Sequence, residues 1–455
     1  MMFESRNPAT GELLDVFDLL ADSQLEDRLV RARAVSRDWQ RSTLEQRAAL
    51  LRATADCIRA ERDSLARSIS LEMGKLLPEA FGEVDKCALC CDYYADHAGE
   101  MLNEEPIATE ARDSRVIFEP LGVILAVMPW NFPLWQVFRF LAPTLMAGNV
   151  ALLKHAPNVS RCALLIEDIL HRAGAPEGLF STLLISVEQT AKVIADERVR
   201  GVAFTGSEAT GRRIGALAGE HLKKAVLELG GSDPFIVLDD ADLDRAVEMA
   251  MKLRFGNAGQ ICIAAKRFIL LPGIANAFVE RLVERVGLLQ TGNPLDAGTT
   301  LAPMARDDLR LQLQAQVQAS ISEGARVLIG GEPQHGDGWF YKPTVLDGIK
   351  PGNTAFSEEL FGPVASIVRA RDEADAVCLA NATRFGLGAS VWTSDVEKGE
   401  ALARQIDAGA CFVNAPVASD LRMPFGGTKA SGLGRELASY GIREFCNIKS
   451  LWVAE

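Results

Sequence analysis

Residues 123–153 read VILAVMPWNFPLWQVFRFLAPTLMAGNVALL, and this stretch decides the fold. Two apolar runs, 123–127 and 149–153, flank a segment over 135–147 whose apolar residues have helical spacing. Strands that are apolar throughout are typical of a parallel sheet that helices cover on both faces. The stretch therefore predicts a strand–helix–strand unit of an α/β protein.

The same alternation continues along the chain toward its C-terminal end. Further strands are predicted at 201–205, 235–238, 267–271, 364–368, 410–413 and 445–453, and further helices at 160–173, 208–219, 241–253, 275–289, 308–322 and 395–407. Residues 24–100 are predicted to be helical, because apolar residues recur there every three or four positions. The pattern predicts two α/β halves that meet near 228–233, where Gly230 and Gly231 lie.

Composition narrows the class of protein. The chain has 455 residues, of which 48% are hydrophobic and 24% charged, as in soluble globular proteins of two or three domains. A net charge of -13 argues against a nucleic-acid or anionic-membrane partner, since both need a basic surface. The longest uncharged run, 120–138, is interrupted by Pro129, Asn131 and Pro133, so we do not expect a membrane span there.

The cysteines indicate the compartment. There are nine of them at irregular spacing, which favours a reducing cytosol, and the N-terminal residues lack the pattern of a signal peptide. Cys87, Cys90 and Cys91 have the spacing of half a zinc site, but no second pair follows at finger spacing. We therefore expect a cytoplasmic protein without a metal site.

Four local patterns suggest chemistry. Gly206 lies in a tight turn between a strand and a helix, where backbone N–H groups can meet phosphate. Cys262 follows a turn-forming stretch, and a nearby helix N-terminus would lower its thiol pKa. Glu228 ends an apolar strand, where burial makes a carboxyl group a general base, and Asn131 lies between two prolines as an immobilised amide donor. Each pattern taken alone also fits an ordinary turn, thiol or strand end.

Their order along the chain is more specific. The motifs in sequence are Asn131, Lys154, the turn at Gly206, Glu228-Leu229-Gly230-Gly231, Gly259-Gln260-Ile261-Cys262, Glu358-Glu359-Leu360-Phe361-Gly362-Pro363 and Pro424-Phe425-Gly426-Gly427. This series resembles the aldehyde dehydrogenase superfamily over nearly the whole chain. The resemblance implies a Rossmann-type cofactor domain over 1–102, 121–227 and 416–435, a catalytic domain over 228–415, and a β-arm for oligomerisation over 103–120 and 436–455.

The resemblance also implies roles for single residues. Cys262 would attack the aldehyde, Asn131 and the Cys262 backbone N–H would stabilise the oxyanion, and Glu228 would activate the hydrolytic water. The implied cofactor-binding residues are Trp130, Lys154, Pro157, Gly206, Ser207, Glu359 and Phe361. Because Pro157 stands where strictly NAD-using relatives often carry an acid, no carboxylate excludes NADP, and we expect both NAD and NADP to be used.

The substrate is expected to be a semialdehyde. Arg139, Trp135 and Ser419 match positions that bind the distal carboxylate in succinate semialdehyde dehydrogenases, and several stretches resemble the short bacterial branch of these enzymes. Gly256 stands where many members carry a second Arg, so the grip on the carboxylate is weaker or is supplied differently. The alternatives are oxidation of glutarate semialdehyde or uncharged aliphatic aldehydes, or a binding protein that keeps the fold without activity. Family members are commonly homo-dimers or homo-tetramers.

Overall fold

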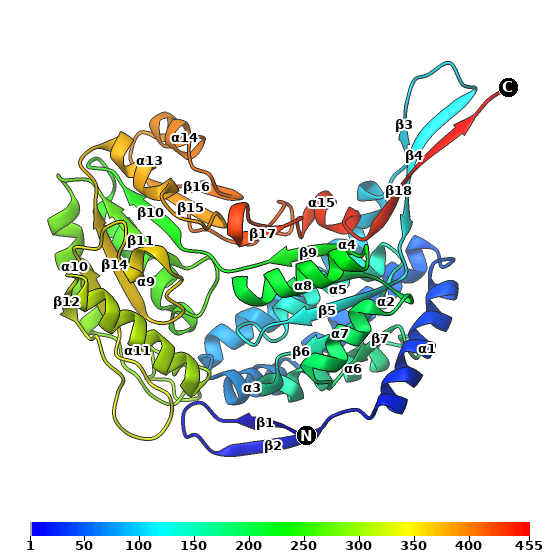
Figure 1. Cartoon of the computed structure of the whole chain (residues 1–455), viewed down its shortest axis with the longest axis horizontal. Helices are drawn as coiled ribbons and strands as arrows, with labels where there is room; N and C mark the ends of the chain where they lie inside the picture. The colour runs from blue at the N-terminus through cyan, green and yellow to red at the C-terminus, as the bar shows by residue number, and fades with distance from the viewer. Residues whose placement is uncertain (1) are drawn as a thin grey trace.

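The computed structural model describes residues 2–455 and builds them around two large β-sheets and two small ones (Figure 1). The chain passes from the first large sheet to the second between Glu228, which ends one strand, and Asp233, which begins the next. The change of sheet falls within the predicted 228–233 seam. The predicted domain boundaries remain predictions.

The first large sheet has six strands in the order β17-β9-β8-β5-β6-β7, and all of its pairings except β17 with β9 are parallel. Its strands are β5 (Val123–Met128), β6 (Val150–His155), β7 (Phe180–Thr182), β8 (Val199–Thr205), β9 (Lys224–Glu228) and β17 (Gly432–Leu433). Within the central strands β5 and β6, every residue is buried except Val127 and Lys154, which are half-buried. This near-continuous burial explains why these strands read as uninterrupted apolar runs.

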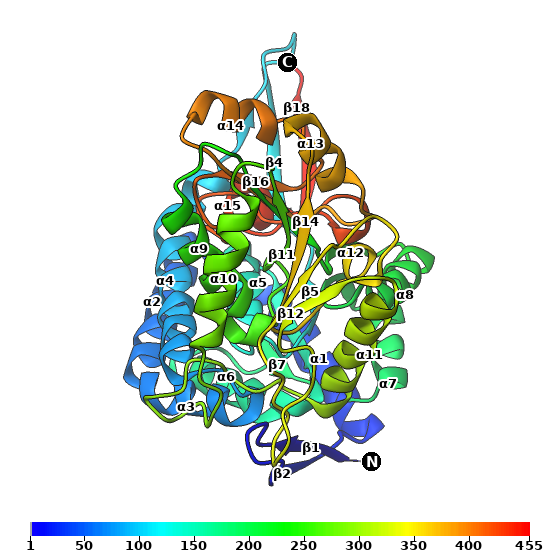
Figure 2. The ribbon, with the colours of Figure 1, turned by 90° about the vertical axis from the view of Figure 1, so that its left-hand side faces the viewer.

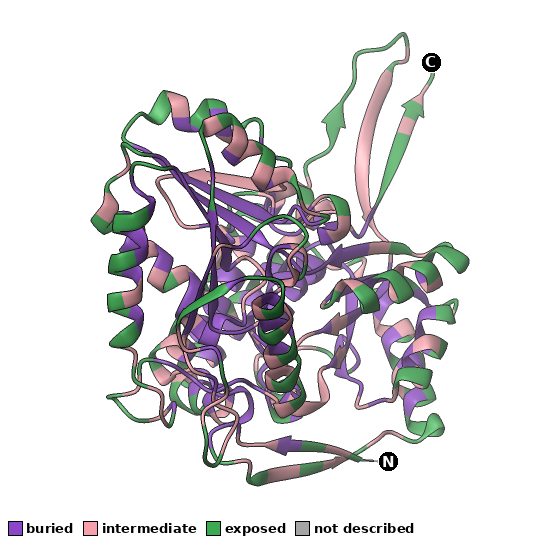
Figure 3. Cartoon of the chain, turned by 60° about the vertical axis from the view of Figure 1, so that its left-hand side comes forward, coloured by how far each residue is buried: buried purple, intermediate pink, exposed green. Residues whose placement is uncertain are grey.

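The second large sheet has seven strands in the order β12-β13-β14-β11-β10-β15-β16, and only β12 runs antiparallel to its neighbour. Its strands are β10 (Asp233–Val237), β11 (Ala265–Leu270), β12 (Arg326–Ile329), β13 (Thr344–Asp347), β14 (Val364–Arg369), β15 (Gly388–Trp392) and β16 (Ala410–Val413). Figure 2 views this half of the molecule from its own side. Figure 3 shows that the strands of both large sheets are mostly buried, whereas the outer faces of the helices are exposed.

The helices of the first half precede and connect the strands of the first sheet. They are α1 (Asp22–Trp39), α2 (Leu44–Ala60), α3 (Arg62–Met73), α4 (Leu77–Met101), α5 (Trp135–Met146), α6 (Ser160–Arg172), α7 (Val187–Ala195) and α8 (Glu208–Glu220), with a 3-10 turn at Pro157–Val159. The helices of the second half are α9 (Leu243–Phe255), α10 (Ala275–Gly287), α11 (Asp307–Ser322), α12 (Thr354–Ser357), α13 (Glu373–Asn381) and α14 (Val396–Ala403), with a 3-10 turn at Gly256–Gly259.

Two small sheets complete the chain. β1 (Met2–Arg6) and β2 (Leu13–Asp18) form an N-terminal hairpin, which the sequence analysis did not predict. β18 (Cys446–Val453) pairs antiparallel with β4 (Asp113–Pro120), and β4 also pairs with β3 (Glu105–Pro106). This three-stranded sheet projects from the body as an arm, and α15 (Ala438–Arg443) leads into it (Figure 1).

The α/β class and the alternation predicted from the sequence are confirmed. The helical stretch at 24–100 divides into α1 to α4, and the predicted final strand pairs with β4 in the arm. The uncharged run 120–138 contains the end of β4, all of β5 and the start of α5. Within residues 2–455, none of the helices has the length and apolar character needed to cross a membrane.

Candidate active site

A cavity of about 360 Å³ lies where residues from both large sheets meet. The predicted site residues among its lining are Trp130, Asn131, Gly206, Ser207, Cys262, Glu359 and Phe361. The other predicted site residues lie outside this lining: Glu228, Lys154, Pro157, Arg139, Trp135 and Ser419. The cavity therefore joins the predicted nucleophile to most of the predicted cofactor-binding residues.

The predicted cofactor-binding residues of the first half gather at one edge of its sheet. Trp130 follows β5, Lys154 and Pro157 stand at the end of β6, and Gly206 follows β8. In open parallel sheets, ligands bind outside the carboxyl ends of the strands. Lys154 is half-buried, burial lowers its pKa, and it forms no ion pair within residues 2–455. Such a lysine is available to an anionic group of a ligand.

The N-terminus of α8 also faces the cavity. Ser207 caps the helix, and its Oγ accepts the Thr210 N–H at 3.4 Å. The first N–H groups of a helix carry a partial positive charge that suits phosphate. Glu208 lies beside them, but it pairs with Arg384 at 2.8 Å, so its charge is balanced. The residues present therefore fit a dinucleotide with its pyrophosphate near α8.

Cys262 lies in a turn between the 3-10 segment Gly256–Gly259 and β11. The expectation of a helix N-terminus beside this thiol is wrong, because a strand follows it. Asn257 and Ala258 precede this turn. Their φ values of 50° and 51° lie in the left-handed region, which is strained for residues other than glycine. Burial raises the pKa of the Cys262 thiol to about 11, although the charges of Arg139 and Lys266 act in the opposite direction.

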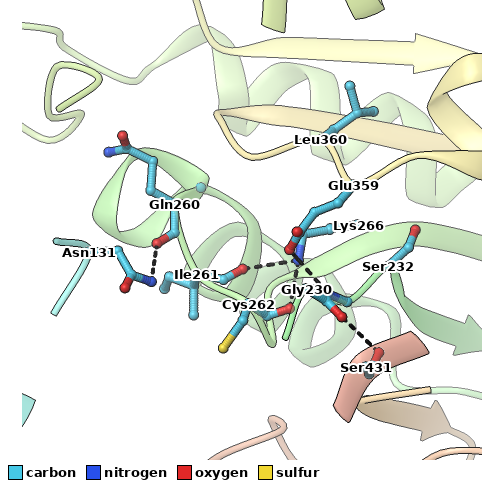
Figure 4. A network of polar contacts seen from close by, with 12 residues as sticks. Asn131, Gly230, Ser232, Gln260, Ile261, Cys262, Lys266, Glu359, Leu360 and Ser431 are labelled. Atoms are coloured by element: carbon cyan, nitrogen blue, oxygen red, sulfur yellow. Dashed lines mark hydrogen bonds and ion pairs between the residues drawn. The ribbon is translucent and has the colours of Figure 1, made fainter. Parts of the chain in front are cut away.

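Asn131 is held beside this turn. Its Nδ2 donates to the carbonyl oxygen of Gln260 at 3.0 Å (Figure 4). Its backbone carbonyl oxygen accepts from Asn257 Nδ2 at 3.0 Å. The side chain of Asn131 is buried, and Asn131 follows β5 directly before α5. The amide is therefore an immobilised donor hydrogen-bonded to Gln260, two positions before Cys262, and such a fixed donor suits an oxyanion site.

Lys266 is a site residue that the sequence analysis did not assign. Its buried Nζ donates to the carbonyl oxygens of Ile261 at 3.1 Å and Cys262 at 2.6 Å, and it pairs with Glu359 Oε1 at 3.0 Å (Figure 4). The Glu359 carboxylate also accepts the Gly231 N–H at 3.1 Å. The available signal was a strand whose first residues include two basic ones, Lys266 and Arg267, four and five residues after Cys262, because buried cations need polar partners.

Glu228 is buried, and neither of its carboxylate oxygens has a hydrogen-bond partner within residues 2–455. Burial raises its pKa well above the usual range, the neighbouring Glu436 raises it further, and Arg139 counteracts both effects. Glu436 is itself buried and forms an ion pair with Arg139. A buried carboxyl group with a raised pKa can accept a proton near neutral pH.

Arg139 therefore already holds a protein carboxylate. Besides the ion pair with Glu436, its Nη2 donates to Thr205 Oγ1 at 3.4 Å, and its guanidinium lies 4.6 Å from the centre of the Phe425 ring. Sequence reasoning did not assign Glu436 a role, because no local pattern indicates which cation a distant glutamate will meet. Whether Arg139 also contacts a substrate carboxylate stays a prediction.

Trp135 and Ser419 are brought together by a third residue. Lys86 Nζ donates to Ser419 Oγ at 2.7 Å and lies 4.1 Å from the centre of the Trp135 ring. Lys86 comes from α4, Trp135 from α5 and Ser419 from the segment after β16. Lys86 was not a sequence candidate.

The cysteines of α4 are packed in the core. Cys87, Cys90 and Cys91 are buried, and all nine cysteines are free. Within residues 2–455, no group of three or more His, Cys, Asp or Glu side chains is arranged to hold a metal ion.

Comparison with known proteins identifies close relatives over the full length. The model of the aldehyde dehydrogenase family matches residues 1–451. The chain is 48% identical over 448 residues to the NAD(P)+ succinate semialdehyde dehydrogenase Sad of Escherichia coli, covering 98% of this chain and 97% of that one. It is 47% identical over 457 residues to the NADP(+) succinate-semialdehyde dehydrogenase 1 of Mycobacterium ulcerans, covering 100% of both chains.

Solved structures agree with this similarity. The crystal structure of succinic semialdehyde dehydrogenase from Streptococcus pyogenes, in complex with NADP+ as the cofactor, matches with a TM-score of 0.98. That match has 40% sequence identity and covers 100% of both chains.

Proposed function

The chain belongs to the aldehyde dehydrogenase family, and on this premise we propose that it oxidises succinate semialdehyde to succinate with NAD or NADP. The observation that carries the proposal is the cavity in which Cys262, the Asn131 amide and the cofactor-binding candidates meet. Full-length similarity to enzymes named for this substrate supports the choice of aldehyde.

The proposed chemistry assigns the first step to Cys262. Its sulfur attacks the aldehyde carbon, and the oxygen that becomes negative is stabilised by Asn131 Nδ2 and the Cys262 backbone N–H. Burial raises the pKa of the Cys262 thiol to about 11, and the charges of Arg139 and Lys266 oppose this rise and so favour the thiolate that attacks. Bound NAD or NADP supplies the hydride acceptor.

The second step releases the acid from the enzyme. The acyl group is left on Cys262 as a thioester, and Glu228 is proposed to take a proton from the water that hydrolyses it. Its raised pKa suits this role, because a general base works best when its pKa is near the working pH. The neighbouring Glu436 raises the pKa of Glu228 further, whereas the charge of Arg139 limits how far that pKa rises.

The choice between NAD and NADP is proposed to be open. Lys154 has no carboxylate partner within residues 2–455, and Pro157 presents no negative charge to a 2′-phosphate. Missing repulsion does not by itself create a preference, because specificity usually needs an active element. Relatives named for NADP(+) and for NAD(P)+ are consistent with either cofactor.

Location and assembly are parts of the same proposal. Nine free thiols suit a reducing compartment, which supports a cytoplasmic enzyme. The projecting arm ends in an edge strand, β18, whose outer side has no partner strand among residues 2–455. Unpaired edges favour pairing with another chain, so we infer a homo-dimer or homo-tetramer.

A rate panel tests the function. Succinate semialdehyde, glutarate semialdehyde and butanal are each offered with NAD and with NADP, and NAD(P)H formation is followed by absorbance. We expect the highest kcat/KM for succinate semialdehyde and activity above background with both cofactors. A higher kcat/KM for glutarate semialdehyde or butanal would mean that this aldehyde, and not succinate semialdehyde, is the preferred substrate. Absence of turnover with all three would favour a binding protein.

A further inference from the structure

Lys86 is a cation without a counter-charge. It lies on α4, is half-buried, and has two polar or aromatic contacts: the hydroxyl of Ser419 at 2.7 Å and the face of Trp135 at 4.1 Å. It forms no ion pair with a carboxylate within residues 2–455. Buried charges in proteins are normally paired, so this ammonium group lacks an anion.

The surrounding charges do not supply that anion. Asp420 is adjacent to Ser419, but its carboxylate accepts two hydrogen bonds from Arg422 at 2.9 and 2.7 Å. Glu436 is committed to Arg139. Burial lowers the pKa of Lys86 to about 8, and the positive charge of Arg139 adds to this effect. A bound anion would offset both costs.

The packing of α4 on α5 places Lys86 beside the start of α5, over the Trp135 ring. Glu83 Oε1 accepts the N–H groups of Leu134 at 2.8 Å and Trp135 at 3.0 Å, which fixes α4 against the start of α5. Lys86 follows Glu83 by three residues and so lies on the same face of α4. Trp135 follows Asn131, the oxyanion donor, by four residues.

Lys86 and Cys262 are both influenced by the charge of the same residue, Arg139. The charge of Arg139 lowers the pKa of both the Cys262 thiol and the Lys86 ammonium. Arg139 therefore lies within electrostatic range of both groups.

We propose that Lys86 binds the distal carboxylate of the substrate, with Ser419 Oγ as a second donor and the Trp135 ring beneath the ammonium group. This proposal rests on the proposed oxidation of an ω-carboxy aldehyde. Because Ser419 Oγ accepts from Lys86, its own hydrogen remains available to the carboxylate. The contact is a charge-assisted hydrogen bond, the strong kind in proteins.

Lys86 would supply the positive charge that is missing at Gly256, where many family members carry a second Arg. Arg254 does not replace it, because its Nη2 donates to the carbonyl oxygens of Gly259 at 2.8 Å and Leu360 at 3.3 Å in the core. Arg139 is already paired with Glu436. Lys86 is therefore the cation near Trp135 and Ser419 that a substrate carboxylate can neutralise.

The test compares Lys86→Met with Lys86→Arg in the full-length enzyme. Methionine keeps most of the length and removes the charge, so KM for succinate semialdehyde should rise about 10- to 100-fold. KM for butanal should change less than about 2-fold, and Lys86→Arg should restore most of the lost affinity. Lys252→Met removes an exposed lysine on α9 and should leave both KM values unchanged.

A binding measurement gives a second readout. Isothermal titration of succinate into the cofactor-free enzyme should give a weaker Kd for Lys86→Met and for Ser419→Ala than for the wild type. If wild-type KM and Kd values persist in Lys86→Met, or if KM rises equally for butanal, the proposal is overturned. A wild type that does not prefer succinate semialdehyde over butanal refutes the proposed function instead. If Lys86→Met does not fold, unchanged succinate binding by Ser419→Ala would overturn the carboxylate site.

Discussion

At the scale of single residues, Glu228 is a buried carboxyl group without hydrogen-bond partners in the described part of the chain. Its raised pKa means that, above the ordinary glutamate pKa, the folded protein holds a proton that the unfolded chain has released. Stability therefore falls as the pH rises through that interval. Glutamine at this position cannot ionise, so the variant should not lose stability through this residue as the pH rises.

We predict that Glu228→Gln raises Tm relative to the wild type at about pH 8, and that the difference shrinks toward about pH 4, where the unfolded chain also protonates. The same variant should form one equivalent of NAD(P)H per site and then slow at least about 100-fold, because hydrolysis of the thioester has lost its base. Thermal melts and stopped-flow absorbance measure the two effects. Unchanged steady-state turnover would remove Glu228 from the hydrolytic step.

Arg139 permits a test of two interpretations. Its ion pair with Glu436 predicts that Arg139→Leu raises the pKa of Glu228, so the pH dependence of kcat should move upward by about one to two pH units. The shift should be the same for succinate semialdehyde and butanal. The interpretation taken from the sequence predicts instead a rise in KM for succinate semialdehyde alone. Steady-state kinetics across pH separate these outcomes.

Local sequence patterns combined with family resemblance predicted that Cys262, Asn131 and the cavity-lining cofactor candidates belong to one site, and the structure places them around one cavity. Lys266, Glu436 and Lys86 could not be predicted, because each owes its role to a partner far away in the chain. Lys86, for example, meets Ser419 across 333 positions. The helix N-terminus expected at Cys262 was wrong because a turn with left-handed residues leads into a strand there.

At the scale of elements, α4 supports several parts of the site at once. Glu79 accepts the Asn257 N–H at 3.0 Å, next to the turn that carries Cys262. One turn later Glu83 accepts two N–H groups at the start of α5, directly after Asn131. Lys86 then meets Ser419. One helix face therefore fixes the nucleophile turn, the oxyanion donor and the proposed carboxylate site.

The ion pair between Lys75 and Glu83 should be important for this arrangement. Both side chains are almost fully buried, with exposed fractions of 1% and 0%. We predict that Glu83→Gln lowers the free energy of unfolding by about 3–5 kcal/mol, because it leaves the Lys75 ammonium buried without a counter-charge. The double variant Lys75→Met/Glu83→Gln should recover part of this loss. Urea unfolding measures both, and a double variant as unstable as the sum of its singles would contradict the coupling.

Helices and strands with a clear pattern of apolar residues could be predicted, and those without such a pattern could not. The buried strands β5, β6 and β8 read as apolar runs, and α2 reads as a three-to-four repeat. The hairpin of β1 and β2 was missed because most of its residues are at least partly exposed, so no apolar face marks it. β12 is likewise exposed along most of its length.

At the scale of the whole molecule, the two sheets meet through a segment that needs glycine. A Cβ at Gly230 would collide with the Glu359 carboxylate, and a Cβ at Gly231 would lie 2.9 Å from the Cys262 carbonyl oxygen. The chain therefore crosses between the halves in direct contact with the catalytic turn. This close approach explains why the cavity is formed at the junction of the halves.

The arm is the other large-scale feature, and its apolar surface implies a partner. Ile448 and Trp452 on β18 are 62% and 54% exposed, and their spacing of four places them on one face of the strand. We predict that the wild type has a mass of two or four chains in light scattering, and that Ile448→Asp/Trp452→Asp shifts it toward the 49.2 kDa of one chain. Val187→Asp, which changes a 77% exposed valine on α7, should leave the mass unchanged. An unaltered mass in the double variant would mean that this face of β18 does not hold the subunits together.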